Sequence, residues 1–315
     1  MEHLESKAKY YQANSIAFSS RHTYLNGQQQ YIKFCTKYKL TPYPLEEISL
    51  RLFATYLAES LSFSTIQSYL AAVRHQNVLL GFDAISKPMP LLGLLLKGIK
   101  RSTSARDLQP RLPITISVLR SLKTSLTTSL YPPVDKLMLW SAFTTAFFGF
   151  LRSAEFCAPK VSSFDPATTL LRSDIKILPD VVLLTPKGSK TDNLRKGATN
   201  CLAKSGSSIC PYAAFFRFIS NSPDAQGPLF CFTNGTFLTR QILTSIINQL
   251  LQATEYKDAH FTSHCFRIGA ATSAAANNLP DWLIKALGRW SSDSYQTYIR
   301  TPVEIVDQVP SKLVI

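Results

Sequence analysis

The chain has 315 residues, of which 45% are hydrophobic and 17% are charged. This composition excludes a disordered chain, and the length is sufficient for two ordinary domains, each with its own core. The formal net charge of +14 indicates an anionic partner, although charge alone does not separate nucleic acid from an anionic membrane surface.

The first hundred residues have the pattern of a helical domain. Residues 1–7 lack the apolar core of a secretory signal. Apolar residues then recur at helical spacing in segments that start near Ser19–Ser20, after Pro44, near Ser62 or Ser64, and at Leu91. The residues expected to face inward are Tyr24, Tyr31, Phe34, Ile48, Leu52, Phe53, Tyr56, Leu57, Ile66, Tyr69, Leu70 and Val73. We interpret residues 1–101 as one compact domain.

Residues 102–113 are predicted to form a linker. They are polar, include Arg106 and Arg111, and end with Pro110 and Pro113, which interrupt helices and favour extended backbone. A basic linker can follow a nucleic-acid backbone through phosphate contacts. An ordinary solvated tether explains the same residues equally well.

Residues 114–315 are predicted to form a second domain. Thr115 is placed to cap a first helix, and a long apolar helix is expected from Pro132–Pro133 to residues 151–155. Its apolar stretch, 137–151, is interrupted by hydroxyl residues and is shorter than the roughly 18 residues that a membrane span needs. We therefore interpret it as a buried core helix and expect no membrane association.

Short runs with the character of strands follow at 170–178, 181–185 and 197–203, with a turn at Pro179–Asp180 between the first two. Helices are expected to resume at Pro211, Thr239, Ser263 and Pro280–Asp281. The sequence therefore predicts a mainly α fold with a small antiparallel β-sheet.

The cysteines show no sign of a metal site. They lie at positions 35, 157, 201, 210, 231 and 265 and form no CxxC pair and no Cys/His spacing typical of metal ligands. We expect reduced thiols in a cytosolic or nuclear protein, and no metal.

A group of residues suited to phosphate chemistry lies near the C-terminus. His264 and Arg267 are three residues apart and so share one face of a helix. Trp290 and Tyr298 follow. Such groups can hold a phosphate diester while the tyrosine oxygen attacks its phosphorus.

Earlier parts of the chain add to this group. Arg152 and Glu155 end the long apolar helix, and Lys190 lies in the loop between two predicted strands. In type and order, the set resembles the active site of the tyrosine recombinases and integrases. Residues 189–192 and 288–293 look most like recombinases of eukaryotic mobile elements.

The resemblance covers nearly the whole chain and implies a layout of two domains. Residues 1–101 correspond to a helical core-binding domain that contacts DNA, residues 102–113 to a linker, and residues 114–315 to an α+β catalytic domain. It also implies an enzyme that breaks and rejoins DNA through a 3′-phosphotyrosyl link with a free 5′-hydroxyl. No metal, ATP or other cofactor is expected.

The resemblance further implies a role for each residue. Tyr298 is the expected nucleophile. Arg152 and Arg267 are expected to present planar guanidinium groups to the non-bridging phosphate oxygens, which a lysine point charge does less well. His264 takes part in proton transfer or holds a phosphate oxygen. Lys190 is the expected general acid for the leaving 5′ oxygen.

Trp290 is expected to donate its indole N–H to the phosphate, and Glu155 to orient Arg152 or His264. Lys187 lies on the same loop as Lys190 and can reach the same place, and Tyr295 lies three residues before Tyr298. The Trp290–Tyr298 interval is about one residue shorter than in the best-known phage relatives.

The expected partner is double-stranded DNA, with a homo-oligomer, from dimer to tetramer, assembled on it. Val303, Ile305, Val306 and Val309 either dock on a neighbouring copy or cover this chain's own core. A recombinase or integrase of a mobile element, acting in the nucleus, is the leading hypothesis; a prokaryotic source would place it in the cytoplasm or nucleoid. The alternatives are a DNA-binding derivative that no longer cuts and a DNA-relaxing enzyme like the type IB topoisomerases.

Overall fold

The computed structural model describes residues 1–82, 88–103, 112–187, 199–222 and 227–300. The chain divides into two compact units, residues 1–110 and residues 111–315, and this division falls within the segment predicted as a linker. No helix in the described ranges is long and apolar enough to cross a membrane.

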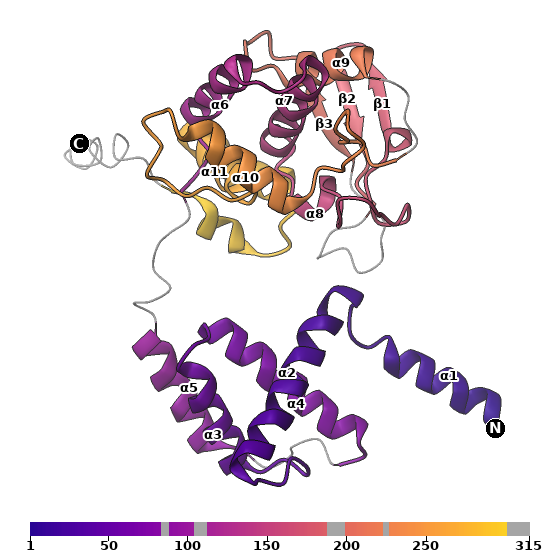
Figure 1. Cartoon of the computed structure of the whole chain (residues 1–315), viewed down its shortest axis with the longest axis vertical. Helices are drawn as coiled ribbons and strands as arrows, with labels where there is room; N and C mark the ends of the chain where they lie inside the picture. Colours follow the sequence, from indigo (N-terminus) through magenta and orange to yellow (C-terminus); the bar gives the residue numbers. More distant parts are fainter. Residues whose placement is uncertain (83–87, 104–111, 188–198, 223–226, 301–315) are drawn as a thin grey trace. The chain divides into compact units, whose positions relative to one another are not determined.

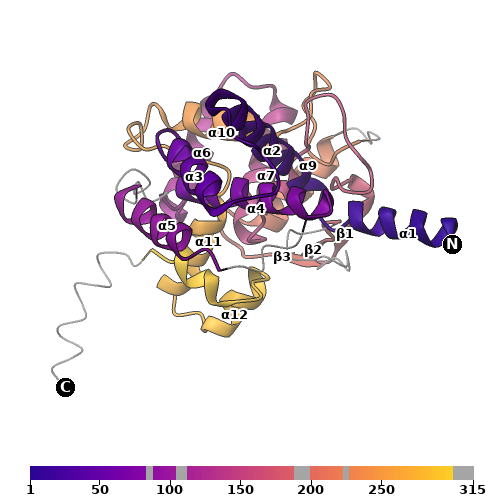
Figure 2. The same cartoon turned by 90° about the horizontal axis from the view of Figure 1, so that it is seen from below.

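The first unit is helical (Figure 1). Its helices are α1 Glu2–Ala13, α2 Phe18–Tyr38, α3 Glu47–Ala58, α4 Phe63–Leu79 and α5 Pro90–Thr103. Helices α2 to α5 pack together around Tyr31, Phe53 and Leu92, each at most 1% exposed. Helix α1 was not predicted, and it projects away from the other helices of its unit in both views (Figures 1 and 2).

Helix phase in this unit differs from the prediction at two points. Ile48 and Leu52 were expected to face inward, but they are 50% and 47% exposed. Helix α3 instead buries Leu50 and Phe53, because the face that contacts α4 and α5 is centred one residue away from the predicted stripe.

Of two predicted helix starts in the first unit, the one at Ser19–Ser20 is wrong and the one at Ser62 is confirmed. Helix α2 begins at Phe18 after Ala17, so the Ser19–Ser20 pair lies inside the first turn and does not cap it. Ser62 does cap α4, accepting a hydrogen bond from the backbone N–H of Thr65 at 3.4 Å.

The second unit combines helices with one small sheet. Its helices are α6 Ile116–Thr128, α7 Pro133–Phe148, α8 Ser153–Phe156, α9 Pro211–Asn221, α10 Arg240–Leu251, α11 Cys265–Ala276 and α12 Asp281–Leu287, with 3₁₀ turns η1 Arg172–Asp174 and η2 Asp293–Tyr298. The strands are β1 Ile175–Leu178, β2 Val181–Leu184 and β3 Asn200–Ala203.

The sheet is antiparallel with the order β1-β2-β3, which confirms the predicted fold class. Ile175 pairs with Leu184, and Leu184 in turn pairs with Asn200. Alternate residues of β2 and β3 are buried, and α9 packs against both strands. The first strand starts at Ile175 and not at Leu170, because the backbone between them turns through η1.

Helix α7 lies at the centre of this unit. It packs against α6, α9 and α11, and even its hydroxyl residues Ser141, Thr144 and Thr145 are fully buried. The helix ends at Phe148, earlier than predicted. Phe150, just beyond it, has a left-handed backbone with φ 49°, so the chain turns before it reaches Arg152.

Candidate active site

The turn after α7 places Arg152 and Glu155 together. Arg152 immediately precedes α8, and Glu155 is the third residue of that short helix. The Glu155 carboxylate accepts from the backbone N–H of Arg152 at 2.8 Å and from its Nη1 at 3.1 Å. The Glu155 side chain is only 2% exposed, whereas that of Arg152 is 20% exposed. The carboxylate therefore fixes both the backbone and the head group of Arg152.

Helix α11 supplies His264 and Arg267. His264 precedes the helix, and Arg267 lies in its first turn, so the two share one face. Arg267 is fully buried and donates from Nη1 to the carbonyl oxygen of Phe150 and from Nη2 to that of Gly288. Burial is the main cause that lowers the pKa of Arg267, to about 9, and the positive charge of the nearby Arg152 adds to this effect.

The turn between α12 and η2 brings in Trp290 and a further arginine. A Cβ atom on Gly288 would overlap the Trp290 ring, so glycine allows the indole to fold back over this turn. The Trp290 ring lies 4.1 Å from the guanidinium carbon of Arg267. Its indole N–H is buried and has no hydrogen-bond partner among the residues that the structure describes.

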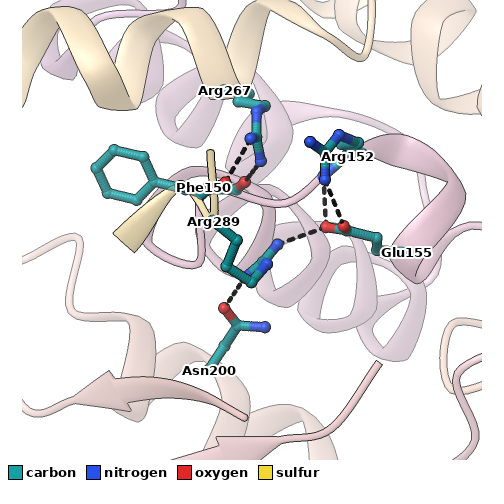
Figure 3. A network of polar contacts seen from close by, with 7 residues as sticks. Phe150, Arg152, Glu155, Asn200, Arg267 and Arg289 are labelled. Atoms are coloured by element: carbon teal, nitrogen blue, oxygen red, sulfur yellow. Dashed lines mark hydrogen bonds and ion pairs between the residues drawn. The ribbon is translucent and has the colours of Figure 1, made fainter. Parts of the chain in front are cut away.

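Arg289 has a left-handed backbone, with φ 54°, and its side chain points inward. Its Nη2 lies 2.6 Å from Oε2 of Glu155, and its Nη1 donates to Oδ1 of Asn200, at the start of β3 (Figure 3). Burial lowers the pKa of Arg289, an effect that the adjacent Glu155 carboxylate opposes.

Tyr298 ends η2 beside these groups. Its ring centroid lies 5.2 Å from that of His264 and 5.3 Å from that of Trp290, and the Arg267 guanidinium carbon is 5.9 Å away. The hydroxyl of Thr272 donates to the carbonyl oxygen of Tyr298 at 3.2 Å, which ties the end of η2 to α11.

Tyr295, the competing tyrosine, is placed differently. It is 4% exposed and belongs to the hydrophobic core, with its ring centroid 6.2 Å from that of Trp290. Tyr298 is half-buried at the edge of the same core. Of the two, Tyr298 is the one whose ring lies against His264.

Most of the residues predicted for the site are therefore gathered in one place. The structure brings together Arg152, Glu155, His264, Arg267, Trp290 and Tyr298. Lys190 lies outside the described residues. Lys187 is described, and its amino group lies 3.0 Å from a carboxylate oxygen of Asp174 and donates to the carbonyl oxygen of Pro166 at 2.7 Å.

Sequence reasoning assigned no role to Arg289 or Asn200. The sequence did contain a signal for Arg289. The Trp290–Tyr298 interval is about one residue shorter than in the phage relatives, and an interval counted from Arg289 to Tyr298 is one residue longer. Asn200 carried no comparable signal, since its contact depends on how β3 lies beside the Gly288–Trp290 turn.

The charges in this cluster favour an anion. Three guanidinium groups, those of Arg152, Arg267 and Arg289, surround the single carboxylate of Glu155, which leaves a net charge of +2. Mutual repulsion in a partly buried site is relieved by a bound anion. Among the described residues, no group of three or more His, Cys, Asp or Glu side chains could hold a metal ion.

The chain has a helical unit followed by an α+β unit, and the second unit gathers Arg, His, Arg and Tyr side chains. This is the fold of the tyrosine recombinases. Among solved structures, the Tn1549 transposon integrase in complex with transposon right end DNA matches with a TM-score of 0.64 at 14% identity, over 98% of each chain. A lambda integrase dimer bound to a COC′ core site gives 0.59 at 14%, over 94% of each chain.

The XerH site-specific recombinase bound to its difH substrate gives a TM-score of 0.58 at 13% identity, over 85% of this chain and 70% of that one. No protein-family model matches the sequence. No curated protein matches it either. At these identities the structural likeness establishes the fold.

Proposed function

We propose that this chain is a site-specific DNA recombinase or integrase whose nucleophile is Tyr298. The placement of Tyr298 carries the proposal. Its ring lies against His264 and Trp290 and near Arg267, although these residues come from α11, the Gly288–Trp290 turn and η2. A hydrophobic core alone has no need for this combination of a nucleophile, an imidazole and guanidinium groups.

The reaction follows from these groups. The Tyr298 Oη attacks the phosphorus of a DNA phosphodiester, and its proton passes to His264 or to water. The bond from phosphorus to the 5′ oxygen breaks, and that oxygen takes a proton from Lys190. The products are a 3′-phosphotyrosyl link and a free 5′-hydroxyl, and attack by another 5′-hydroxyl reverses the step and joins new strands.

Arg152 is the guanidinium group best placed to meet the phosphate, because its side chain is 20% exposed while Glu155 holds it from behind. Arg267 is fully buried, with its two Nη atoms on the carbonyl oxygens of Phe150 and Gly288. The rings of Trp290 and Tyr298 lie beside its guanidinium group, so a direct contact with phosphate requires a shift of one of these rings. The indole N–H of Trp290 is a further donor for a phosphate oxygen.

The proposal extends to the setting of the reaction. The XerH structure contains a difH substrate and the lambda integrase structure a dimer on a core site, which supports double-stranded DNA and an assembly of copies as partners of this chain. The similarity to the transposon integrase supports an origin in a mobile element, and we place the protein in the nucleus on the resemblance of residues 189–192 and 288–293 to eukaryotic elements.

A covalent-adduct assay tests the function. The protein is incubated with nicked suicide DNA that carries candidate element ends, and the products are separated in denaturant. The wild type and Tyr295→Phe are expected to form a protein–DNA adduct, and Tyr298→Phe is expected to form none. Tyr295→Phe is the matched control, because Tyr295 lies three residues away in the same 3₁₀ turn.

A wild type that binds these DNAs and never forms an adduct would support a derivative that no longer cuts. Adduct formation by Tyr298→Phe but not by Tyr295→Phe would assign the nucleophile to Tyr295. Relaxation of supercoiled plasmid by the monomer, without any exchange of strands between sites, would favour the topoisomerase alternative.

A further inference from the structure

Arg289 is built into the arginine cluster more firmly than a surface cation would be. Its side chain is 16% exposed, and both ends of its guanidinium fork are bound, one to Glu155 and the other to Asn200. The backbone at Arg289 is in the left-handed region, which non-glycine residues adopt at a cost and keep only where the surroundings hold them. The turn is therefore shaped to place this side chain inside.

The contact joins two arginines through one carboxylate. Oε1 of Glu155 forms an ion pair with Nη1 of Arg152 at 3.1 Å, and Oε2 forms one with Nη2 of Arg289 at 2.6 Å (Figure 3). We call this set of three side chains the Glu155 bridge. The Glu155 side chain is 2% exposed, so water does not compensate its charge.

The sharing determines the net charge that the Glu155 bridge presents to an anion. Without Arg289, Glu155 would form a direct ion pair with Arg152 alone, and that pair would carry no net charge toward a phosphate, so that Arg267 would be the one uncompensated arginine of the cluster. With Arg289, two positive charges share one negative charge, so Arg152 is held in place while the Glu155 bridge keeps a net positive charge. In a site of low dielectric, this difference acts strongly on an incoming anion.

Asn200 completes the arrangement. It is 8% exposed, and its side-chain oxygen accepts from Nη1 of Arg289, which keeps the arginine from turning away toward solvent. Because Asn200 begins β3, the Glu155 bridge is also fixed to the sheet.

We propose that Arg289 is a positioning residue for DNA strand cleavage, which shares Glu155 with Arg152 and so keeps Arg152 oriented while the Glu155 bridge retains a net positive charge toward the DNA phosphate. This inference rests on the proposed recombinase function. Arg289 acts through Glu155 and Arg152 and need not touch the DNA.

The test is a double-mutant cycle on single-turnover cleavage of nicked suicide DNA. It compares wild type, Arg289→Gln, Glu155→Gln and the double variant, with DNA binding and thermal unfolding measured for each. Arg289→Gln is expected to slow cleavage by roughly 10- to 100-fold, the usual effect of losing a partner that orients a reacting group. Its affinity for DNA is expected to change much less than its cleavage rate, because the site supplies one of many phosphate contacts along this basic chain.

The sign of the coupling between the Arg289 and Glu155 substitutions distinguishes a positioning role of Arg289 from damage to the structure. When Glu155 is already neutral, Arg289 has no carboxylate to share, so the double variant is expected to cleave faster than the product of the two single effects. Arg289→Lys keeps the charge and is expected to cleave faster than Arg289→Gln. Arg172→Gln is the matched control, because Arg172 also holds structural hydrogen bonds, to Ser222 and Ile219. It is expected to cleave as the wild type does.

Cleavage by Arg289→Gln at the wild-type rate, or single effects that simply multiply in the double variant, would overturn the inference and leave the proposed function standing. A wild type that forms no adduct overturns the function, and the inference falls with it. If Arg289→Gln does not fold, the same cycle is run with Arg289→Lys, and simple multiplication of effects again counts against the inference.

Discussion

Among single residues, Lys187 is the informative case, because it was the alternative to Lys190 as the general acid. The amino group of Lys187 is held by the Asp174 carboxylate at 3.0 Å and by the Pro166 carbonyl oxygen at 2.7 Å. A general acid has to reach the leaving oxygen, and Lys187 would have to break both contacts first. These contacts favour Lys190 for proton transfer.

We therefore predict that Lys190→Met slows strand cleavage on the order of 10²-fold, the usual contribution of general acid catalysis, while Lys187→Met cleaves at nearly the wild-type rate. Single-turnover cleavage of suicide DNA measures both. A substrate with sulfur in place of the leaving 5′ oxygen is the control. Sulfur leaves without needing a proton, so it should restore the rate of Lys190→Met. A slow Lys187→Met that sulfur rescues would assign the acid to Lys187.

Residue type and order were enough to identify most of the candidate site. Phosphoryl transfer needs planar cations, a proton carrier and a nucleophile, and few residue types supply them, so Arg152, His264 and Tyr298 were recognisable in the sequence. Arg289 was missed because an isolated arginine is usually a surface residue, and because Trp290 was assigned the role of this turn. Only the folded turn shows that its side chain points toward Glu155.

At the scale of elements, α11 is held by the chain that enters its unit. The backbone N–H of Ile114 donates to the carbonyl oxygen of Cys265 at 2.9 Å, and Ile114 is fully buried. Gly269, one turn further along α11, allows this close approach, because a Cβ there would overlap the carbonyl group of Ile114.

Gly269→Ala is accordingly predicted to lower the free energy of unfolding of the second unit by about 1–3 kcal/mol, the usual cost of overpacking, and to slow cleavage by shifting α11. Tryptophan fluorescence in urea measures this unit alone, since all three tryptophans, Trp140, Trp282 and Trp290, belong to it. Gly93→Ala in α5 adds a methyl group with no atom within 4 Å and should leave this transition unchanged. An unaltered transition in Gly269→Ala would show that the Ile114 contact is not tight.

Elements were easier to predict than their faces and ends. Periodicity located α3, but Ile48 and Leu52 lie outside because two overlapping apolar stripes share that helix, and only packing against α4 and α5 selects one. Helix α7 ends at Phe148 because Gly149, a residue type that often ends helices, is followed by the left-handed turn at Phe150, which carries no turn signal of its own.

At the scale of the whole molecule, charge is the property that the sequence established most directly. The chain has 34 Lys and Arg residues against 20 Asp and Glu residues, which gives the net charge of +14. The arginine cluster adds a local excess of positive charge. The proposed binding to DNA would release counterions from many phosphates, which would make the affinity depend on salt.

We predict that the affinity for DNA falls on the order of 10³-fold between roughly 50 and 200 mM salt, as for proteins that contact about six phosphates or more. Fluorescence anisotropy with labelled duplex measures it. Tyr298→Phe should give the same slope, because the substitution removes no charge. A flat response would exclude an extended phosphate contact along the basic chain.

The attachment of Ile114 to α11 also has a mechanical consequence. Near the start of the second unit, the backbone of Ile114 is hydrogen-bonded to Cys265, one residue after His264 and within the first turn that carries Arg267. Because Cys265 lies between His264 and Arg267, a displacement of Ile114 would act directly on the segment that carries both side chains. The alignment of these two side chains therefore depends on how residues 112–114 are held, although the two segments lie far apart in the sequence.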